Sequence, residues 1–171
     1  MSTQAYNWPD RLFDTLKRGG IRQVGYVPDA GHARLIERCR GDEEIRDVAL
    51  TTEEEGVALA AGAWLGGERA VLLMQSSGLG NCINMLSLPV TCRMPFLTLV
   101  TMRGEWAEFN PWQVPMGSIT EQVLKLSGFL TFRAEQAGDV DAIVGSGCDM
   151  AYEGNLRIAI ILSQRMVGHR R

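Results

Sequence analysis

Two near-continuous apolar runs constrain the fold of this 171-residue chain more than any other feature. They read Phe96-Leu97-Thr98-Leu99-Val100 and Ile158-Ala159-Ile160-Ile161-Leu162. A strand with one face in water alternates apolar and polar residues, whereas a parallel strand covered on both faces is apolar throughout. The two runs therefore predict a parallel sheet that lies between two layers of helices.

Helix and strand signals alternate along the whole chain. Strands are expected at residues 21–27, 46–51, 69–75, 95–102, 129–133 and 157–163. Helices are expected from residue 9 to 18 and at 33–40, 53–64, 81–88, 119–126 and 140–152, with a glycine loop at 76–80 and no clear period at 103–118. This order predicts an α/β fold, a three-layer doubly wound sandwich with a six-stranded, mainly parallel sheet. Residues 1–171 are expected to form a single domain.

Composition excludes several functional classes. The chain has 17 Lys+Arg against 20 Asp+Glu, a net charge of -3, so no basic surplus favours nucleic acid. No apolar stretch reaches the roughly 20 residues that span a bilayer, and the amino terminus shows no secretory signal. The four cysteines lack metal-site spacing and read as reduced thiols, so we expect a cytoplasmic protein without a metal site of its own.

Two segments contain residues that could take part in ligand binding or catalysis. Thr51-Thr52-Glu53-Glu54-Glu55-Gly56 opens a helix, and Gln75-Ser76-Ser77-Gly78-Leu79-Gly80-Asn81 follows the next strand. Acidic residues in a first turn also stabilise a helix dipole, and Asn81 could cap a helix, so each segment has a structural interpretation. However, both follow neighbouring strands, and the carboxyl ends of such strands form the ligand-binding edge of a doubly wound sheet. The glycine segment lacks both the third glycine of a dinucleotide fingerprint and the lysine of a Walker loop.

The stretch from Val24 to Ser118 resembles the pyrimidine-binding domain of thiamine-diphosphate-dependent 2-oxoacid decarboxylases. It is most similar to sulfopyruvate decarboxylase alpha subunits and to phosphonopyruvate decarboxylases. The matching motifs are the acidic segment above with Ala60-Ala61-Gly62, the string Met74-Gln75-Ser76-Ser77-Gly78-Leu79-Gly80-Asn81, Met102-Arg103-Gly104, and residues 113–117.

The resemblance implies that one glutamate hydrogen-bonds the aminopyrimidine ring and activates thiamine diphosphate. The family glutamate commonly lies nine residues before a helix glycine, and counting back from Gly62 gives Glu53. Glu54 and Glu55 are close competitors. Gly78, Leu79, Gly80 and Asn81 are the other expected cofactor-binding residues.

Candidate substrate residues follow from their places after the strands. Asp29 and His32 follow the first strand, and Arg103 follows the fourth, where its guanidinium could bind an anionic group or pair with Glu105 or Glu108. His32 could equally be a solvated loop histidine or a local hydrogen bonder. Gln113, in the last matching segment, is also a candidate.

The chain lacks the Gly-Asp-Gly and Asn-Asn strings with which the family binds magnesium and the diphosphate. The resemblance therefore implies a diphosphate-binding beta subunit that carries them, in a heterotetramer or larger assembly. The implied reaction is decarboxylation of a small anionic 2-oxoacid, with 3-sulfopyruvate as the leading candidate. Two alternatives stay open: a split-subunit carboligase or lyase acting on another ketone or oxoacid, and a noncatalytic α/β ligand-binding module.

Overall fold

The computed structural model describes residues 7–168. The amino-terminal stretch considered for a secretory signal lies largely outside this range. The elements, in chain order, are α1 (Trp8–Arg18), β1 (Ile21–Tyr26), α2 (Ala33–Arg40), β2 (Arg46–Ala49), α3 (Glu53–Leu65), β3 (Arg69–Gln75), α4 (Ser76–Cys82), α5 (Ser87–Thr91), β4 (Phe96–Thr101), the 3-10 helix η1 (Pro111–Gln113), α6 (Val114–Leu126), β5 (Leu130–Ala134), α7 (Val140–Tyr152), β6 (Arg157–Leu162) and α8 (Gln164–Val167).

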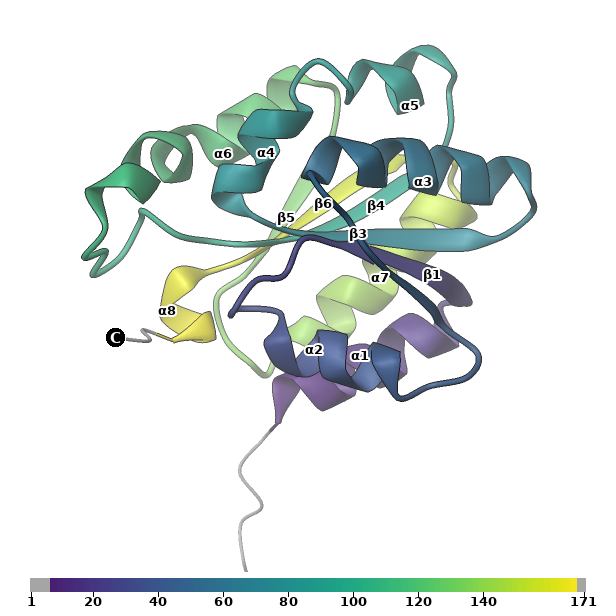
Figure 1. The fold of residues 1–171 in the computed structure, drawn as a ribbon, viewed down its shortest axis with the longest axis horizontal. Coiled ribbons are helices and arrows are strands. Elements are labelled where there is room, and N and C mark those ends of the chain that lie inside the picture. Colours follow the sequence, from purple (N-terminus) through teal and green to yellow (C-terminus); the bar gives the residue numbers. More distant parts are fainter. Residues whose placement is uncertain (1–6, 169–171) are drawn as a thin grey trace, which may run out of the picture.

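The six strands form one sheet in the order β2-β1-β3-β4-β6-β5 (Figure 1). Every strand pair is parallel. The chain first winds outward from β1 to β2 and then crosses back to β3 on the other side of β1. The strand order therefore reverses between β1 and β3, the position at which a doubly wound sheet opens a crevice for ligands.

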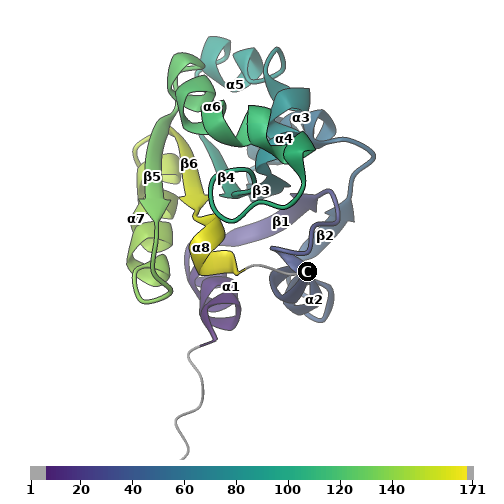
Figure 2. The same cartoon turned by 90° about the vertical axis from the view of Figure 1, so that its left-hand side faces the viewer.

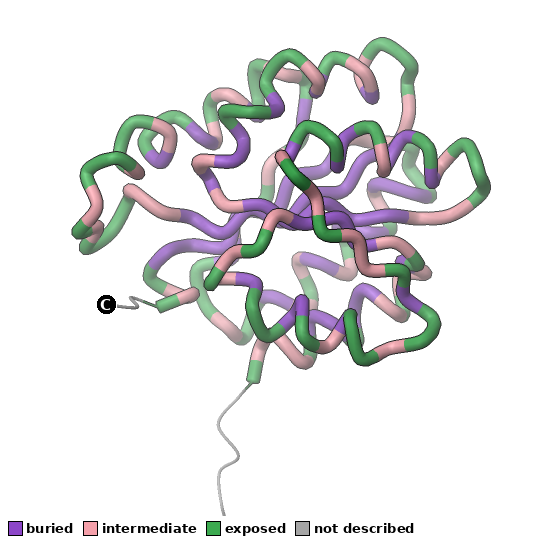
Figure 3. Tube along the Cα trace, in the orientation of Figure 1, coloured by how far each residue is buried: buried purple, intermediate pink, exposed green. Residues whose placement is uncertain are grey.

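Helices cover both faces of the sheet, as predicted. Figures 1 and 2 show α1, α2 and α7 on one face and α3, α4, α5 and α6 on the other. Each face has its own apolar core, and all six residues of β4 are buried between them (Figure 3). The apolar runs of β4 and β6 both lie inside the sheet, as β3 does, where each strand has a neighbour on either side and helices on both faces.

Small residues bring α3 close to the sheet. A side chain at Gly56 would meet Leu72 Cδ1 at 2.2 Å, so the helix can approach β3 only because this position has no Cβ. Ala60 and Ala63 continue the same buried face. This packing sets the first turn of α3, with its three glutamates, at the carboxyl edge of the sheet.

Most strand and helix boundaries agree with the sequence expectations to within one or two residues. The glycine-loop prediction was wrong, because residues 76–80 lie within helix α4, and the helix expected at 81–88 is replaced by a turn and α5. Pro89 lies at the third position of α5, where its missing N–H leaves no helical hydrogen bond unmade. Helix α6 begins at Val114 rather than 119, with Pro115 in its first turn, and the short α8 was not predicted.

Across residues 7–168, no helix combines the length and the apolar character needed to cross a membrane.

Candidate active site

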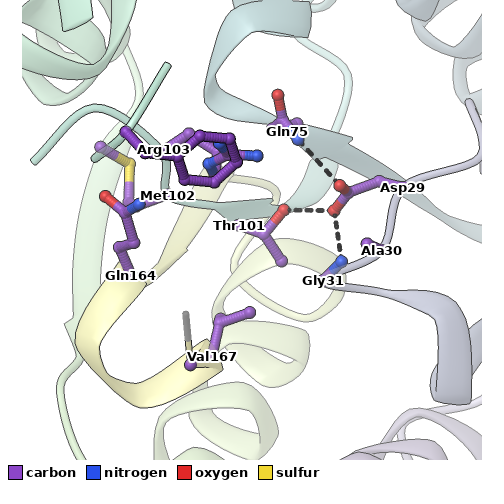
Figure 4. A pocket seen from close by; sticks show the side chains of 11 residues that line it. Asp29, Ala30, Gly31, Gln75, Thr101, Met102, Arg103, Gln164 and Val167 are labelled. Carbon is purple, nitrogen blue, oxygen red and sulfur yellow. Dashed lines mark hydrogen bonds between the residues drawn. The ribbon is translucent and has the colours of Figure 1, made fainter. Parts of the chain in front are cut away.

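A small cavity lies at the carboxyl ends of β1, β3, β4 and β6, beside the point where the strand order reverses. Its volume is about 50 Å³, enough for only a few water molecules. Figure 4 shows the side chains that line it, which come from the loop after β1, the ends of β3 and β4, the segment after β4 and helix α8. The lining residues are Asp29, Ala30, Gly31, Gln75, Thr101, Met102, Arg103, Phe109, Gln164, Val167 and Gly168.

The Asp29 carboxylate connects three strands at this edge (Figure 4). Its Oδ1 accepts a hydrogen bond from Gln75 Nε2 at 2.8 Å, and its Oδ2 accepts one from Thr101 Oγ1 at 2.7 Å. The Gly31 amide donates to the same Oδ2 at 3.1 Å. A Cβ at Gly31 would lie 2.8 Å from Thr101 Cγ2, so only glycine lets the loop reach β4. Asp29 therefore lies at the cavity, as expected, but its carboxylate already accepts three hydrogen bonds.

His32 is not a solvated loop residue. It is 1% exposed, and its Nε2 lies 3.2 Å from the Leu99 carbonyl oxygen. Burial lowers the pKa of the imidazole, so the ring is neutral at physiological pH. Its Nδ1 is buried and has no hydrogen-bond partner in the described part of the chain. The ring does not line the cavity, and the predicted contact with substrate has no geometric support here.

Arg103 lines the cavity, but its charge is already paired. Its Nε and Nη2 donate to the two Glu108 carboxylate oxygens at 2.7 and 2.6 Å. The guanidinium and further hydrogen-bond donors hold the pKa of Glu108 well below its usual range. Of the two pairings considered from sequence, Glu108 is therefore the partner. Arg103 could bind an anionic group only if this pair opened or shifted.

The segment after β4 is also held from the opposite side by Gln164. This side chain is 2% exposed, and its Oε1 accepts hydrogen bonds from the Glu105 and Trp106 amides at 3.1 and 3.0 Å. Its Nε2 donates to Glu108 Oε2 at 2.8 Å. Gln113 lies in η1, away from the cavity lining, and its Oε1 is buried without a hydrogen-bond partner among residues 7–168. Its predicted substrate contact stays a prediction.

The three glutamates of α3 occupy different environments. Glu53 is 8% exposed and faces α4, whereas Glu54 and Glu55 are exposed. Glu55 Oε2 accepts a hydrogen bond from the Thr51 amide at 2.8 Å, which helps to close the amino end of the helix. Geometry therefore singles out Glu53, the residue favoured by counting from Gly62.

Helix α4 provides the surface on which the Glu53 carboxylate lies. A Cβ at Gly78 would be 2.3 Å from Glu53 Oε1, so the carboxylate occupies the space that a side chain at position 78 would fill. One turn later, Asn81 Nδ2 donates to Glu53 Oε2 at 2.8 Å. Leu79 points into the core and is fully buried, while Gly80 is exposed beside Met116. Two of the four predicted residues of this segment thus contact Glu53.

The first turn of α4 joins this carboxylate to the cavity. Ser76 Oγ accepts a hydrogen bond from the Arg103 amide at 3.1 Å, and Ser77 Oγ donates to Gln75 Oε1 at 2.8 Å. Gln75, Thr101, Glu108 and Gln164 were not among the predicted site residues. The first two end buried strands, a position that could have marked them. Glu108 and Gln164 could not be identified from sequence, because they meet only where the segment after β4 packs against α8.

Proteins of known identity align with almost the whole chain. The "Sulfopyruvate decarboxylase subunit alpha" of Methanothermobacter thermautotrophicus is 32% identical over 155 residues, covering 90% of this chain and 93% of its own. The protein of the same name from Methanocaldococcus jannaschii is 30% identical, with 88% and 89% covered. This chain belongs to the family of sulfopyruvate decarboxylase alpha subunits.

Another relative matches a smaller part of the chain. The "Phosphonopyruvate decarboxylase" of Streptomyces viridochromogenes is 40% identical over 109 residues, which make up 63% of this chain and 28% of that protein. No family model matches the chain.

Solved structures share its fold. A putative thiamin diphosphate-dependent enzyme from Mycobacterium smegmatis superposes with a TM-score of 0.68 at 16% identity, over 92% of this chain and 30% of that one. The 2-oxoglutarate:ferredoxin oxidoreductase of Magnetococcus marinus gives 0.73 at 13% identity, over 94% and 29%.

Proposed function

We propose that residues 1–171 form the pyrimidine-binding alpha subunit of a two-subunit, thiamine-diphosphate-dependent 2-oxoacid decarboxylase in the cytoplasm. The single observation that carries this proposal is the Glu53 carboxylate. It is nearly buried at the ligand-binding edge, lies against Gly78, and accepts one hydrogen bond, from Asn81. Membership of the sulfopyruvate decarboxylase alpha family, over nearly the full length of its relatives, supports the same function.

The residues of this edge fit the pyrimidine half of the cofactor. A ring nitrogen needs a partner that can share a proton, and Glu53 offers a carboxylate oxygen to which no described residue donates. Thiamine diphosphate, when bound, supplies the carbon nucleophile that adds to a 2-oxoacid and accepts the electrons left by departing CO2. Glu53 would hold and exchange the proton at the pyrimidine ring, and the missing side chain at Gly78 leaves the space in which its carboxylate lies.

We propose that the diphosphate half of the cofactor is bound by another chain. Within residues 7–168, no group of three His, Cys, Asp or Glu side chains is placed to hold a metal ion. We therefore propose that magnesium and the diphosphate are bound by a beta subunit with Gly-Asp-Gly and Asn-Asn motifs, in a heterotetramer or larger assembly. The name "subunit alpha" of the relatives supports a second subunit.

The partner would cover the aromatic segment after β4. Trp106, Phe109 and Trp112 are 47%, 61% and 84% exposed at the same edge of the sheet as Glu53. Apolar side chains this exposed commonly mark protein interfaces. A partner seated here would also exclude water from a cavity that is too small and too open to enclose a substrate alone.

The substrate we propose is a small 2-oxoacid with a second anionic group, with 3-sulfopyruvate as the leading candidate. Named sulfopyruvate and phosphonopyruvate decarboxylases among the relatives support this class. In this chain, Arg103 is the cationic group at the cavity, and Asp29 also lines it. Gln113 and His32, which do not line the cavity, stay candidates for substrate contact. Because Glu108 already neutralises Arg103, binding of the second anion would require this pair to rearrange or the partner to supply a cation.

The proposal is tested by replacing Glu53 in the complete complex. Glu53→Gln keeps the size of the side chain but cannot exchange a proton, so turnover of 3-sulfopyruvate should fall at least about a hundredfold while the subunits still assemble. The matched control is Glu54→Gln, since Glu54 is exposed and should leave turnover unchanged. Full activity of the Glu53 variant would refute the proposed mechanism.

A further inference from the structure

The two oxygens of the Glu53 carboxylate are not equivalent. Oε2 accepts the hydrogen bond from Asn81 Nδ2 at 2.8 Å. Oε1 lies against the Gly78 backbone, where a Cβ would be 2.3 Å away, and no side chain or amide in the described range donates to it. Gly78 and Asn81 lie three residues apart on α4, so they present one continuous face to the carboxylate.

This arrangement fixes where a proton can reside on Glu53. The Asn81 side chain must turn its NH2 group toward Oε2, because its carbonyl oxygen would repel an ionised carboxylate. A proton on Oε2 would then face the hydrogens of that NH2 group, while a proton on Oε1 meets no donor. Oε1 is therefore the oxygen that can release and take up a proton without breaking an existing hydrogen bond.

We infer that Asn81 is a positioning residue, which holds Glu53 by Oε2 and assigns Oε1 to proton exchange with the pyrimidine ring. The inference deepens the proposed function and rests on it. Asn81 is itself exposed, and its hydrogen bond joins only partly buried groups, so its contribution to folding stability should be small. If Asn81 had only a structural role, changing it would lower the stability of the fold. If it positions Glu53, changing it should slow proton exchange and leave stability unchanged.

The test uses the complete complex with thiamine diphosphate and two nearly isosteric variants. Asn81→Leu removes the donor, and Asn81→Asp replaces it with a second carboxylate. The readout is the rate at which the C2 hydrogen of bound thiamine diphosphate exchanges with deuterium, measured without substrate, together with the dissociation constant of the cofactor and the melting temperature of the alpha chain.

Both Asn81 variants should slow exchange at least about tenfold, because each loses a hydrogen bond to a charged group. The Asp variant should be slower, because the two carboxylates also repel each other. Cofactor affinity should change less than about threefold and the melting temperature should not change. The matched control is Asn84→Asp, because Asn84 is also exposed and lies in the turn just after α4.

Exchange at the wild-type rate in both Asn81 variants would overturn the positioning role, as would a loss of exchange that merely follows a fall in melting temperature. The parallel Glu53→Gln variant separates the two proposals. Slow exchange in that variant with normal exchange in the Asn81 variants refutes only the positioning role. Normal exchange in Glu53→Gln refutes the proposed function itself.

Discussion

At the scale of single residues, the missing side chain at position 78 decides where the Glu53 carboxylate can lie. The Glu53 side chain crosses the space that a Cβ on Gly78 would occupy, with Cδ 2.4 Å and Cγ 2.6 Å from that position. Glycine is unfavourable inside a helix by about 1 kcal/mol relative to alanine. Its presence in α4 is thus explained by space for a neighbour rather than by local stability.

Gly78→Ala should separate stability from activity. The new methyl group would displace the flexible Glu53 side chain, so turnover of the complete complex should fall at least about tenfold. Folding stability, measured by urea unfolding of the alpha chain, should change by less than about 1 kcal/mol because better helix propensity offsets the displacement. The control is Gly62→Ala in α3, where a Cβ would meet nothing within 4 Å. Unchanged turnover in Gly78→Ala would show that the position of the carboxylate is not critical.

At the scale of elements, the segment between β4 and η1 is held by polar contacts rather than by a core of its own. Arg103 and Gln164 both bond to Glu108, whose side chain is only 4% exposed. The Gly104 and Asn110 amides also donate to that carboxylate, at 3.0 and 2.9 Å. One buried carboxylate therefore fixes a segment whose aromatic side chains face outward.

This dependence predicts a pH response. The pKa of Glu108 is lowered in the folded state, so its contribution to stability is present above the unfolded value of about 4.3 and is lost as pH falls toward the folded value. Urea unfolding from neutral to acid pH should show wild type losing stability more steeply below about pH 4.3 than Glu108→Gln does. The exposed Glu43→Gln serves as the control. Parallel curves for wild type and Glu108→Gln would contradict this account.

The sequence was most informative where burial alone decides structure. The apolar runs of β4 and β6 predict parallel strands that are covered on both faces, and both strands lie inside the sheet. The segment at 76–80 was misassigned as a loop because glycine has low helix propensity. In the structure it lies within α4, with Gly78 packed against Glu53. Glu53 was predicted from its spacing from Gly62, and its role stays a prediction. The Arg103–Glu108 pairing could not be chosen over Glu105 from sequence, because it depends on the path of the intervening chain.

At the scale of the whole molecule, the edge that carries Glu53 also carries the most exposed aromatic side chains. Trp112 is 84% exposed in η1. The other end of the sheet also has an exposed apolar residue, Leu65, at 75%, at the end of α3. Trp112 and Leu65 are similarly exposed but lie at opposite ends of the strands. Substituting each in turn therefore tests which end of the sheet binds the partner.

Trp112→Ser should weaken binding of the beta subunit at least about tenfold, because large aromatic residues dominate protein interfaces. The melting temperature of the alpha chain alone should stay unchanged, since the ring is mostly in solvent. Leu65→Ser is the control and should leave subunit affinity unchanged, as measured by analytical ultracentrifugation of the mixed subunits. Equal affinities for wild type and Trp112→Ser would place the interface elsewhere.

The order of the sheet also has a consequence for synthesis of the chain. Strand β4 pairs with β6, with Phe96 opposite Arg157, so one side of β4 stays unpaired until residues 157–162 are available. Contacts so distant in sequence form slowly. A nascent chain that has emerged only to about residue 150 exposes one edge of β4, whose residues are all buried in the folded protein, with no partner strand to cover it. Such a chain is prone to aggregation, and chaperones would have to shield β4 until β6 has been synthesised.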